Sequence, residues 1–140
     1  MNNLKRFTEA QQRDYAQALR EIQNGRKESH WIWYIFPQLK GLGRSYTSDF
    51  YGIVDLDEAK AFLQDPYLGK HLQKISEALL NLDNDNATQI MGRPDDMKLK
   101  SSMTLFALAK PECEVFQKVL DKFFHGERDQ RTVEILQLVH

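Results

Sequence analysis

Apolar residues recur at intervals of three and four positions along most of this chain. Such spacing places them together on one face of an α-helix, and Tyr15, Ala18 and Ile22 are one example. The pattern predicts helices over seven stretches, which are residues 8–23, 58–64, 67–82, 88–92, 94–109, 112–124 and 130–139.

Residues that commonly begin helices stand in front of several of these stretches. Thr8, followed three residues later by Gln11, forms a capping-box pattern at the start of the first one. Asp57 and Asp129 precede two others in the position of an N-cap, where a side-chain oxygen accepts from free backbone N–H groups. These signals support the helical interpretation of the spacing.

The aromatic stretch SHWIWYIFPQ, residues 29–38, fits either a helix or a strand by composition. Because no other strand is predicted to pair with it, we expect a helix with Ser29 as its N-cap. A helix that is apolar on every side is largely buried. Two interpretations stay open: the stretch is purely core, or it turns Trp31 or Trp33 into a cleft with His30 at the rim.

These elements predict an all-α fold, a single compact domain over residues 1–140 with seven to nine mostly short helices. At 140 residues, 41% apolar and 28% charged, the chain has the size and composition of one globular domain. No apolar run approaches the about 20 residues of a membrane span, and the N-terminus MNNLKRFTEA lacks the apolar segment of a secretory signal. We therefore expect a cytoplasmic protein without membrane contact.

The charge is nearly balanced, with a net value of -1. Duplex nucleic acid is held by many Lys and Arg side chains, so we do not expect it as a partner. A small anion needs only a few local donors, and the loop LKGLGRS offers them. Gly41 and Gly43 allow backbone N–H groups to point outward, and Arg44 has a fork of donors that suits phosphate or carboxylate. The alternative is a plain turn between two helices.

A second cluster lies in GRPDDMKLKSSMTLF, on the helix predicted over residues 94–109. Asp95, Lys98 and Ser102 fall on one side of that helix, and Lys98 and Ser101 form an i, i+3 pair. A lysine beside a serine can activate the hydroxyl as a nucleophile if burial lowers the lysine pKa. Two alternatives remain: the hydroxyls bind a ligand, or they bond back to the helix and permit close packing.

Metal sites are not expected. His30, His71, His125 and His140 are far apart in the sequence, and the chain has no HExxH, CxxC or EF-hand pattern. We also expect no cofactor.

Long blocks of the chain resemble one protein family. GRKESHWIWYIFPQLKGLGRS, PDDMKLKSSMTLFALA and FQKVLDKFFHGERDQRTVEIL are similar to the bacterial domain-of-unknown-function family number eighteen-ten, often labelled calpastatin. The resemblance runs from about residue 5 to the C-terminus and implies a compact, mainly helical fold, without an established activity. The matching signature positions are His30, Trp31, Trp33, Phe36, Pro37, Gln38, Gly41, Gly43, Arg44, Asp96, Lys98, Ser101, Ser102, Met103 and Thr104.

Two functions are compatible with these features, and the sequence leaves open whether the protein is an enzyme. The first is a pocket for a small phosphorylated or nucleotide-like ligand, related to NAD or ADP-ribose, as a loose similarity to small helical domains of that metabolism implies. Its ligand-binding residues would be Trp31, Trp33, Gly41, Gly43, Arg44 and Thr104, and its candidate catalytic residues would be His30, Asp96, Lys98, Ser101 and Ser102. The second is a non-catalytic module that binds another protein.

Overall fold

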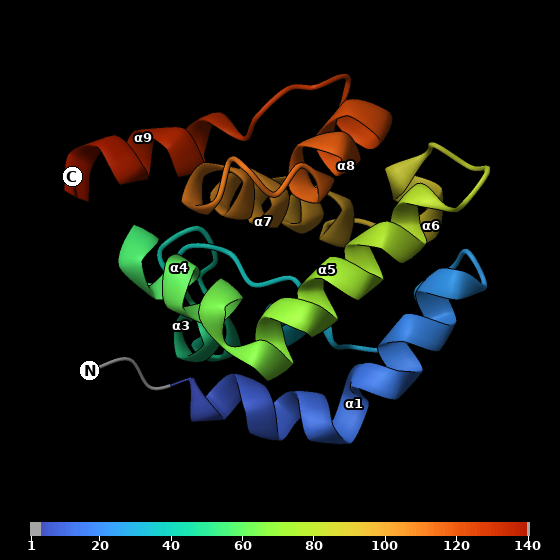
Figure 1. Cartoon of the computed structure of the whole chain (residues 1–140), viewed down its shortest axis with the longest axis horizontal. Coiled ribbons are helices and arrows are strands. Elements are labelled where there is room, and N and C mark those ends of the chain that lie inside the picture. The colour runs from blue at the N-terminus through green and yellow to red at the C-terminus, as the bar shows by residue number, and fades with distance from the viewer. Residues whose placement is uncertain (1–3, 140) are drawn as a thin grey trace.

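The computed structural model describes residues 4–139 of the chain (Figure 1). Every element of regular secondary structure longer than a single bridge in that range is a helix. This confirms the predicted all-α fold. The nine helices found there are α1 (Lys5–Gln23), α2 (Ile32–Ile35), α3 (Tyr46–Tyr51), α4 (Leu56–Gln64), α5 (Pro66–Leu80), α6 (Ala87–Met91), α7 (Asp95–Ala109), α8 (Val115–Phe124) and α9 (Gln130–Val139). None of these helices combines the length and apolar character needed to cross a membrane.

Helix α7 is the centre of the fold. It contacts α2, α4, α6, α8 and α9, and α1 packs outside them against α5. Buried residues lie all around α7, and Leu99, Met103 and Phe106 are fully enclosed. Apart from Met97, which is 50% exposed, little of this helix reaches the solvent, so the two serines of the second sequence cluster, Ser101 and Ser102, are buried in the core.

The first helix begins earlier than its capping pattern predicts. Leu4 precedes it, without a side-chain cap, so Thr8 lies inside the helix and its hydroxyl donates to the Leu4 carbonyl at 3.0 Å. Gln11 instead donates to the Tyr34 carbonyl at 2.8 Å and also contacts His71. The capping-box prediction is therefore wrong, because tertiary contacts give Gln11 a different partner.

A second cap is also displaced. Asp55, not Asp57, accepts from the backbone N–H of Glu58 at 2.8 Å and begins α4. The third predicted cap is confirmed, since Asp129 accepts from the backbone N–H of Thr132 at 3.0 Å at the start of α9. Asp55 and Asp57 lie two positions apart, and either could cap a helix. The spacing of apolar residues alone does not show which of them is the N-cap.

The carboxylate of Glu21 holds the loop between α1 and α2 in place through hydrogen bonds. Glu21 accepts five hydrogen bonds: from the backbone N–H groups of Glu28 and Ser29, the Ser29 hydroxyl, the Trp31 indole and the Gln17 amide. Burial alone would raise the pKa of Glu21, but the bonds from Ser29, Glu28 and Trp31 outweigh it and lower the pKa to about 2. Ser29 is thus a donor to Glu21 rather than the N-cap of α2, whose N-cap position is taken by Trp31.

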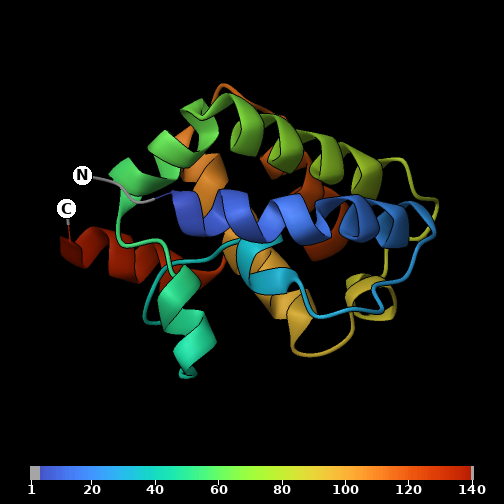
Figure 2. The ribbon, with the colours of Figure 1, turned by 90° about the horizontal axis from the view of Figure 1, so that it is seen from below.

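Helix α3 was not predicted, and it projects from the rest of the molecule (Figure 2, lower left). None of its residues is buried, so it lacks the apolar stripe from which helices are identified in sequences. Ser45 caps it by accepting from the backbone N–H of Ser48 at 3.0 Å. A parallel bridge between Leu39 and Ile53 closes the segment that carries α3.

Candidate functional site

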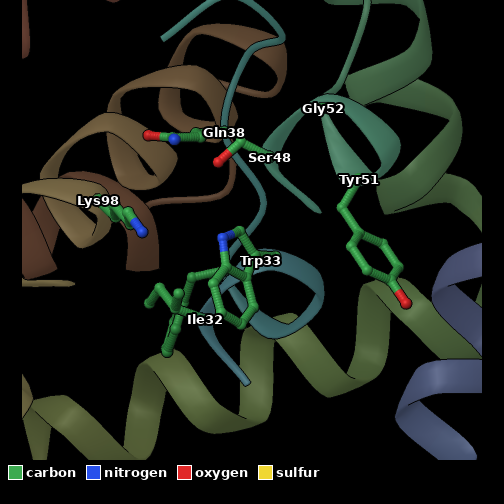
Figure 3. Close-up of a pocket in the computed structure, with 8 residues that line it drawn as sticks. Ile32, Trp33, Gln38, Ser48, Tyr51, Gly52 and Lys98 are labelled. Atoms are coloured by element: carbon green, nitrogen blue, oxygen red, sulfur yellow. The ribbon is translucent and has the colours of Figure 1, made fainter. Parts of the chain in front are cut away.

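A small cavity lies where α2, the segment of residues 38–52 and α7 meet (Figure 3). We call it the Trp33 cavity. It has about 10 Å³ of space for the centre of a water-sized sphere, which is about the room of one water molecule or of one oxygen atom of a larger group. Its lining residues are Ile32, Trp33, Phe36, Gln38, Ser48, Tyr51, Gly52 and Lys98.

The indole nitrogen of Trp33 is the most unusual atom of this cavity. It is buried and has no hydrogen-bond partner within the described part of the chain. Figure 3 shows it pointing toward the space between Gln38 and Ser48. A buried donor without an acceptor destabilises a protein by about 1–3 kcal/mol, so this N–H calls for an explanation.

Lys98 brings a positive charge to the same place. Its ammonium lies 5.2 Å from the centre of the Trp33 ring, within the range of a cation–π contact. Its ion pair with Asp95 Oδ1 is long, at 3.7 Å, whereas Lys27 pairs with the other oxygen, Oδ2, at 2.8 Å. One carboxylate thus bridges two cations, and of these Lys98 lines the cavity.

Gly43 allows the wall to close around the cavity. A Cβ atom at this position would lie 2.3 Å from Ser48 Oγ and 2.5 Å from Ser48 Cβ, distances that real side chains do not adopt. The absence of a side chain therefore lets α3 approach the loop. Ser48 Oγ accepts from the Ser45 hydroxyl at 3.0 Å, and Ser48 lines the cavity.

Two of the polar groups that line the Trp33 cavity, the indole N–H of Trp33 and the ammonium of Lys98, can only donate hydrogen bonds. The amide of Gln38 and the hydroxyls of Ser48 and Tyr51 can either donate or accept. The eight lining residues include no carboxylate. Such a set favours an oxygen atom with negative charge, as in a phosphate or carboxylate group. It does not suit a metal ion, and no group of three or more metal-ligating side chains occurs in the described residues.

An open depression lies beside the Trp33 cavity, and we call it the outer hollow. It has a volume of about 410 Å³ and shares the side chains of Trp33 and Tyr51 with the cavity. Its lining is mostly aromatic and consists of Arg13, His30, Trp33, Tyr34, Tyr46, Thr47, Phe50 and Tyr51.

The structure brings together part of the site predicted from the sequence. Trp33 and Lys98, which are 65 positions apart, line one cavity, and Gly43 lies against its wall. His30 is exposed and lies at the outer hollow. Gly41, whose φ of +102 favours glycine, and the exposed Arg44 belong to the nearby loop but do not line the cavity.

Three of the remaining predicted residues, Trp31, Asp96 and Ser101, form hydrogen bonds within the fold. Trp31 is 1% exposed and donates to Glu21, so it does not offer a surface for stacking. Asp96 accepts from the Thr88 hydroxyl at 2.7 Å, and the Ser101 hydroxyl donates to the Met97 carbonyl at 3.1 Å. These partners depart from the predicted catalytic roles of Asp96 and Ser101.

Two further hydroxyls of α7 also lie away from the cavity lining. Thr104 donates to the Lys100 carbonyl at 2.8 Å and accepts from the backbone N–H of Asp129. Ser102 is completely buried, and its hydroxyl has no partner among the described residues. Of the predicted residues on α7, Lys98 therefore lines the cavity, whereas Ser102 and Thr104 do not.

Sequence reasoning missed Ser48 and Tyr51, and it noted Gln38 only as a family position. Ser48 and Tyr51 lie on α3, which no spacing signal predicts. Gln38 directly follows Pro37 at the end of the aromatic stretch, and a polar residue in that position was the one available signal.

Comparison with known proteins gives a family but no activity. Residues 1–136 match the family model described as Protein of unknown function (DUF1810). The chain is similar to a solved structure, the conserved hypothetical protein Rv1873 from Mycobacterium tuberculosis, with 43% sequence identity and a TM-score of 0.94. That similarity covers 96% of each chain. No curated protein matches.

Proposed function

The chain belongs to the DUF1810 family of proteins of unknown function, and from its site we propose that it binds a small ligand through a phosphate or other anionic group in the Trp33 cavity. The observation that supports this most directly is the buried, unpartnered indole N–H of Trp33 beside the ammonium of Lys98. An anionic oxygen would satisfy both groups at once.

The arrangement of charge supports the same ligand chemistry. Asp95 bridges two lysines, and its contact with Lys98 through Oδ1, at 3.7 Å, is longer than its contact with Lys27 through Oδ2, at 2.8 Å. We expect Lys98 to turn toward a bound anion while Asp95 stays paired with Lys27. Because the ammonium is partly shielded from solvent, its attraction to an anion is stronger than in open water.

The proposal is one of binding rather than of a reaction. The hydrogen bonds of Ser48 are formed with Ser45 and not with a general base. The two predicted acid or base residues also lie elsewhere, since Asp96 is bonded to Thr88 and His30 faces the outer hollow. A nucleophile needs a base within hydrogen-bonding distance.

The alternative of a protein-interaction module is less well supported. That alternative predicts a contiguous exposed apolar patch and no concave site between the two sequence clusters. Tyr46 and Phe50 are exposed and lie with their rings 6.2 Å apart, which favours it, whereas Trp33 and Lys98 line one cavity, which does not.

Calorimetric titration with inorganic phosphate, sulfate and acetate tests the proposal, with Lys98→Met as the diagnostic variant. The loss of one charge-assisted hydrogen bond is expected to weaken phosphate binding about tenfold to a hundredfold. Thermal denaturation gives a second readout, since a ligand at a hundred times its dissociation constant stabilises the fold by about 2.7 kcal/mol.

Lys100→Met is a closely matched control. Lys100 lies on the same helix, pairs with Glu127 at 3.9 Å and lies 5.9 Å from the Phe124 ring, but it is not part of the cavity. This variant should bind phosphate like the parent protein. Equal losses in both lysine variants, or no anion binding by the parent protein, would refute the proposal.

A further inference from the structure

We infer that the anionic group belongs to a larger ligand whose planar heterocyclic ring lies in the outer hollow, so that the ligand class is a phosphorylated heterocycle such as a nucleoside monophosphate. This inference rests on the proposed function and adds the identity of the second half of the ligand.

The size of the Trp33 cavity is the first argument. With about 10 Å³ for the centre of a water-sized sphere, it accepts about one oxygen atom of an anionic group and no ring. The rest of any ligand must lie outside it. The outer hollow, at about 410 Å³, shares the side chains of Trp33 and Tyr51 with the cavity and falls within the size range of small-molecule sites.

The chemistry of the outer hollow is the second argument. Tyr46 is 81% exposed and Phe50 is 46% exposed, although large aromatic side chains are generally buried. Their rings lie 6.2 Å apart at 20° to each other, and Phe50 meets Tyr51 edge to face. An ordered aromatic surface of this kind is a stacking platform for planar rings, and such stacking tolerates different bases.

The rim of the outer hollow is the third argument. Arg13 and His30 line it, and the guanidinium of Arg13 lies 5.7 Å from the centre of the Tyr34 ring. Guanidinium and imidazole groups can stack on a heterocycle or donate to its carbonyl and ring nitrogen atoms. The eight lining residues include no carboxylate, although Arg13 is paired with Asp14 at 3.2 Å, and Asp14 also accepts from the Tyr34 hydroxyl. Arg13 thus brings its charge to the rim as part of an ion pair.

The test compares ligands with and without a ring. Calorimetry of the full chain would be carried out with inorganic phosphate, ribose 5-phosphate, adenosine 5′-monophosphate, uridine 5′-monophosphate and pyridoxal 5′-phosphate. Stacking of one ring is expected to strengthen binding about fivefold to a hundredfold over ribose 5-phosphate.

Tyr46→Ala is the diagnostic variant, because so exposed a side chain can be removed without loss of the fold. It should cancel most of the gain due to the ring and leave the affinity for inorganic phosphate unchanged. Val54→Ala, which removes another exposed apolar side chain outside both sites, should change neither affinity.

The outcomes separate this inference from the proposed function. If phosphate binds in a Lys98-dependent way but no ring compound binds more tightly than ribose 5-phosphate, the ring site is refuted and the anion site stands. If Tyr46→Ala weakens all ligands equally, the outer hollow does not recognise a ring and the inference fails. If nothing binds, both proposals fail and the aromatic surface of α3 becomes a candidate for contact with a protein.

Discussion

Trp31 and Trp33 present their indole N–H groups to opposite environments. Trp31 Nε1 donates to Glu21 Oε1 at 2.9 Å, whereas Trp33 Nε1 is buried at the cavity and finds no acceptor among residues 4–139. The first tryptophan belongs to the scaffold and completes the contacts of Glu21. The second has the N–H group on which the proposed function rests.

Trp33→Phe is expected to separate stability from binding. The substitution removes the unpartnered N–H, which relieves a destabilisation of about 1–3 kcal/mol, but it also removes part of the ring's packing. The two effects oppose each other, so the free energy of unfolding should change by no more than about 1 kcal/mol, while phosphate affinity falls. Denaturant unfolding and calorimetry measure the two quantities.

Trp31→Phe is the matched comparison for that variant. It takes a donor from the buried Glu21 carboxylate, so we expect a loss of about 1.5–3 kcal/mol in unfolding free energy. A Trp33→Phe protein as unstable as the Trp31→Phe protein would mean that the Trp33 N–H already has a partner in the fold.

Glu21 predicts a specific acid sensitivity. Its pKa is lowered from 4.5 to about 2 in the folded protein, so the folded state binds the proton less readily than the unfolded state. The stability that Glu21 contributes is therefore complete above about pH 5 and is lost as the pH falls toward 2. The shift corresponds to roughly 3 kcal/mol, which unfolding experiments at pH 7, 4 and 2.5 can measure.

Glu21→Gln should lower stability at pH 7 and flatten this part of the pH profile. Glu77→Gln, at an exposed position, is the control and should leave the profile unchanged. A steep acid loss that persists in Glu21→Gln would assign the effect to other carboxylates.

The helices could be predicted from the sequence because most of them bury an apolar stripe. Helix α7, Asp95–Ala109, begins one residue later than the predicted range 94–109 and ends at the same residue. Its end could be predicted because Lys110 and Pro111 follow the last residue of the apolar pattern. Helix α3 could not be predicted, because its six residues bury no side chain and its position depends on the contact between Gly43 and Ser48.

The site could be predicted only in part, for a related reason. Trp33 and Lys98 were identified from their chemistry, but spacing cannot show that a hydroxyl in mid-helix is already bonded to the preceding turn. Ser101 and Thr104 are bonded in this way, at 3.1 and 2.8 Å, which is the close-packing alternative that the sequence left open.

Gly43→Ala is expected to deform the wall of the cavity. The new Cβ would overlap Ser48, whose atoms belong to the capped start of α3, so the loop or the helix must shift. We expect a loss of about 1–3 kcal/mol in stability together with weaker phosphate binding. A double-mutant cycle with Ser48→Gly, which removes the overlapping atoms, checks the cause: in that background the Gly43→Ala substitution should be nearly neutral.

Ser102→Ala tests the buried hydroxyl that has no partner. Removing an unsatisfied buried polar group should leave stability unchanged or raise it by up to about 2 kcal/mol, with no effect on phosphate affinity. Thermal denaturation and calorimetry suffice for this comparison. A loss of binding in Ser102→Ala, but not in Ser101→Ala, would restore Ser102 to the site that the sequence predicts.

The environments of the two tryptophans also allow the intrinsic fluorescence of the protein to report ligand binding. They are the only two indoles in the chain. Trp31 is enclosed by the core with Lys27 over its ring, while Trp33 lines both the Trp33 cavity and the outer hollow. A ligand that enters the site should alter the fluorescence of Trp33 and leave that of Trp31 constant. Occupancy and unfolding can then be distinguished by emission alone, without an attached dye.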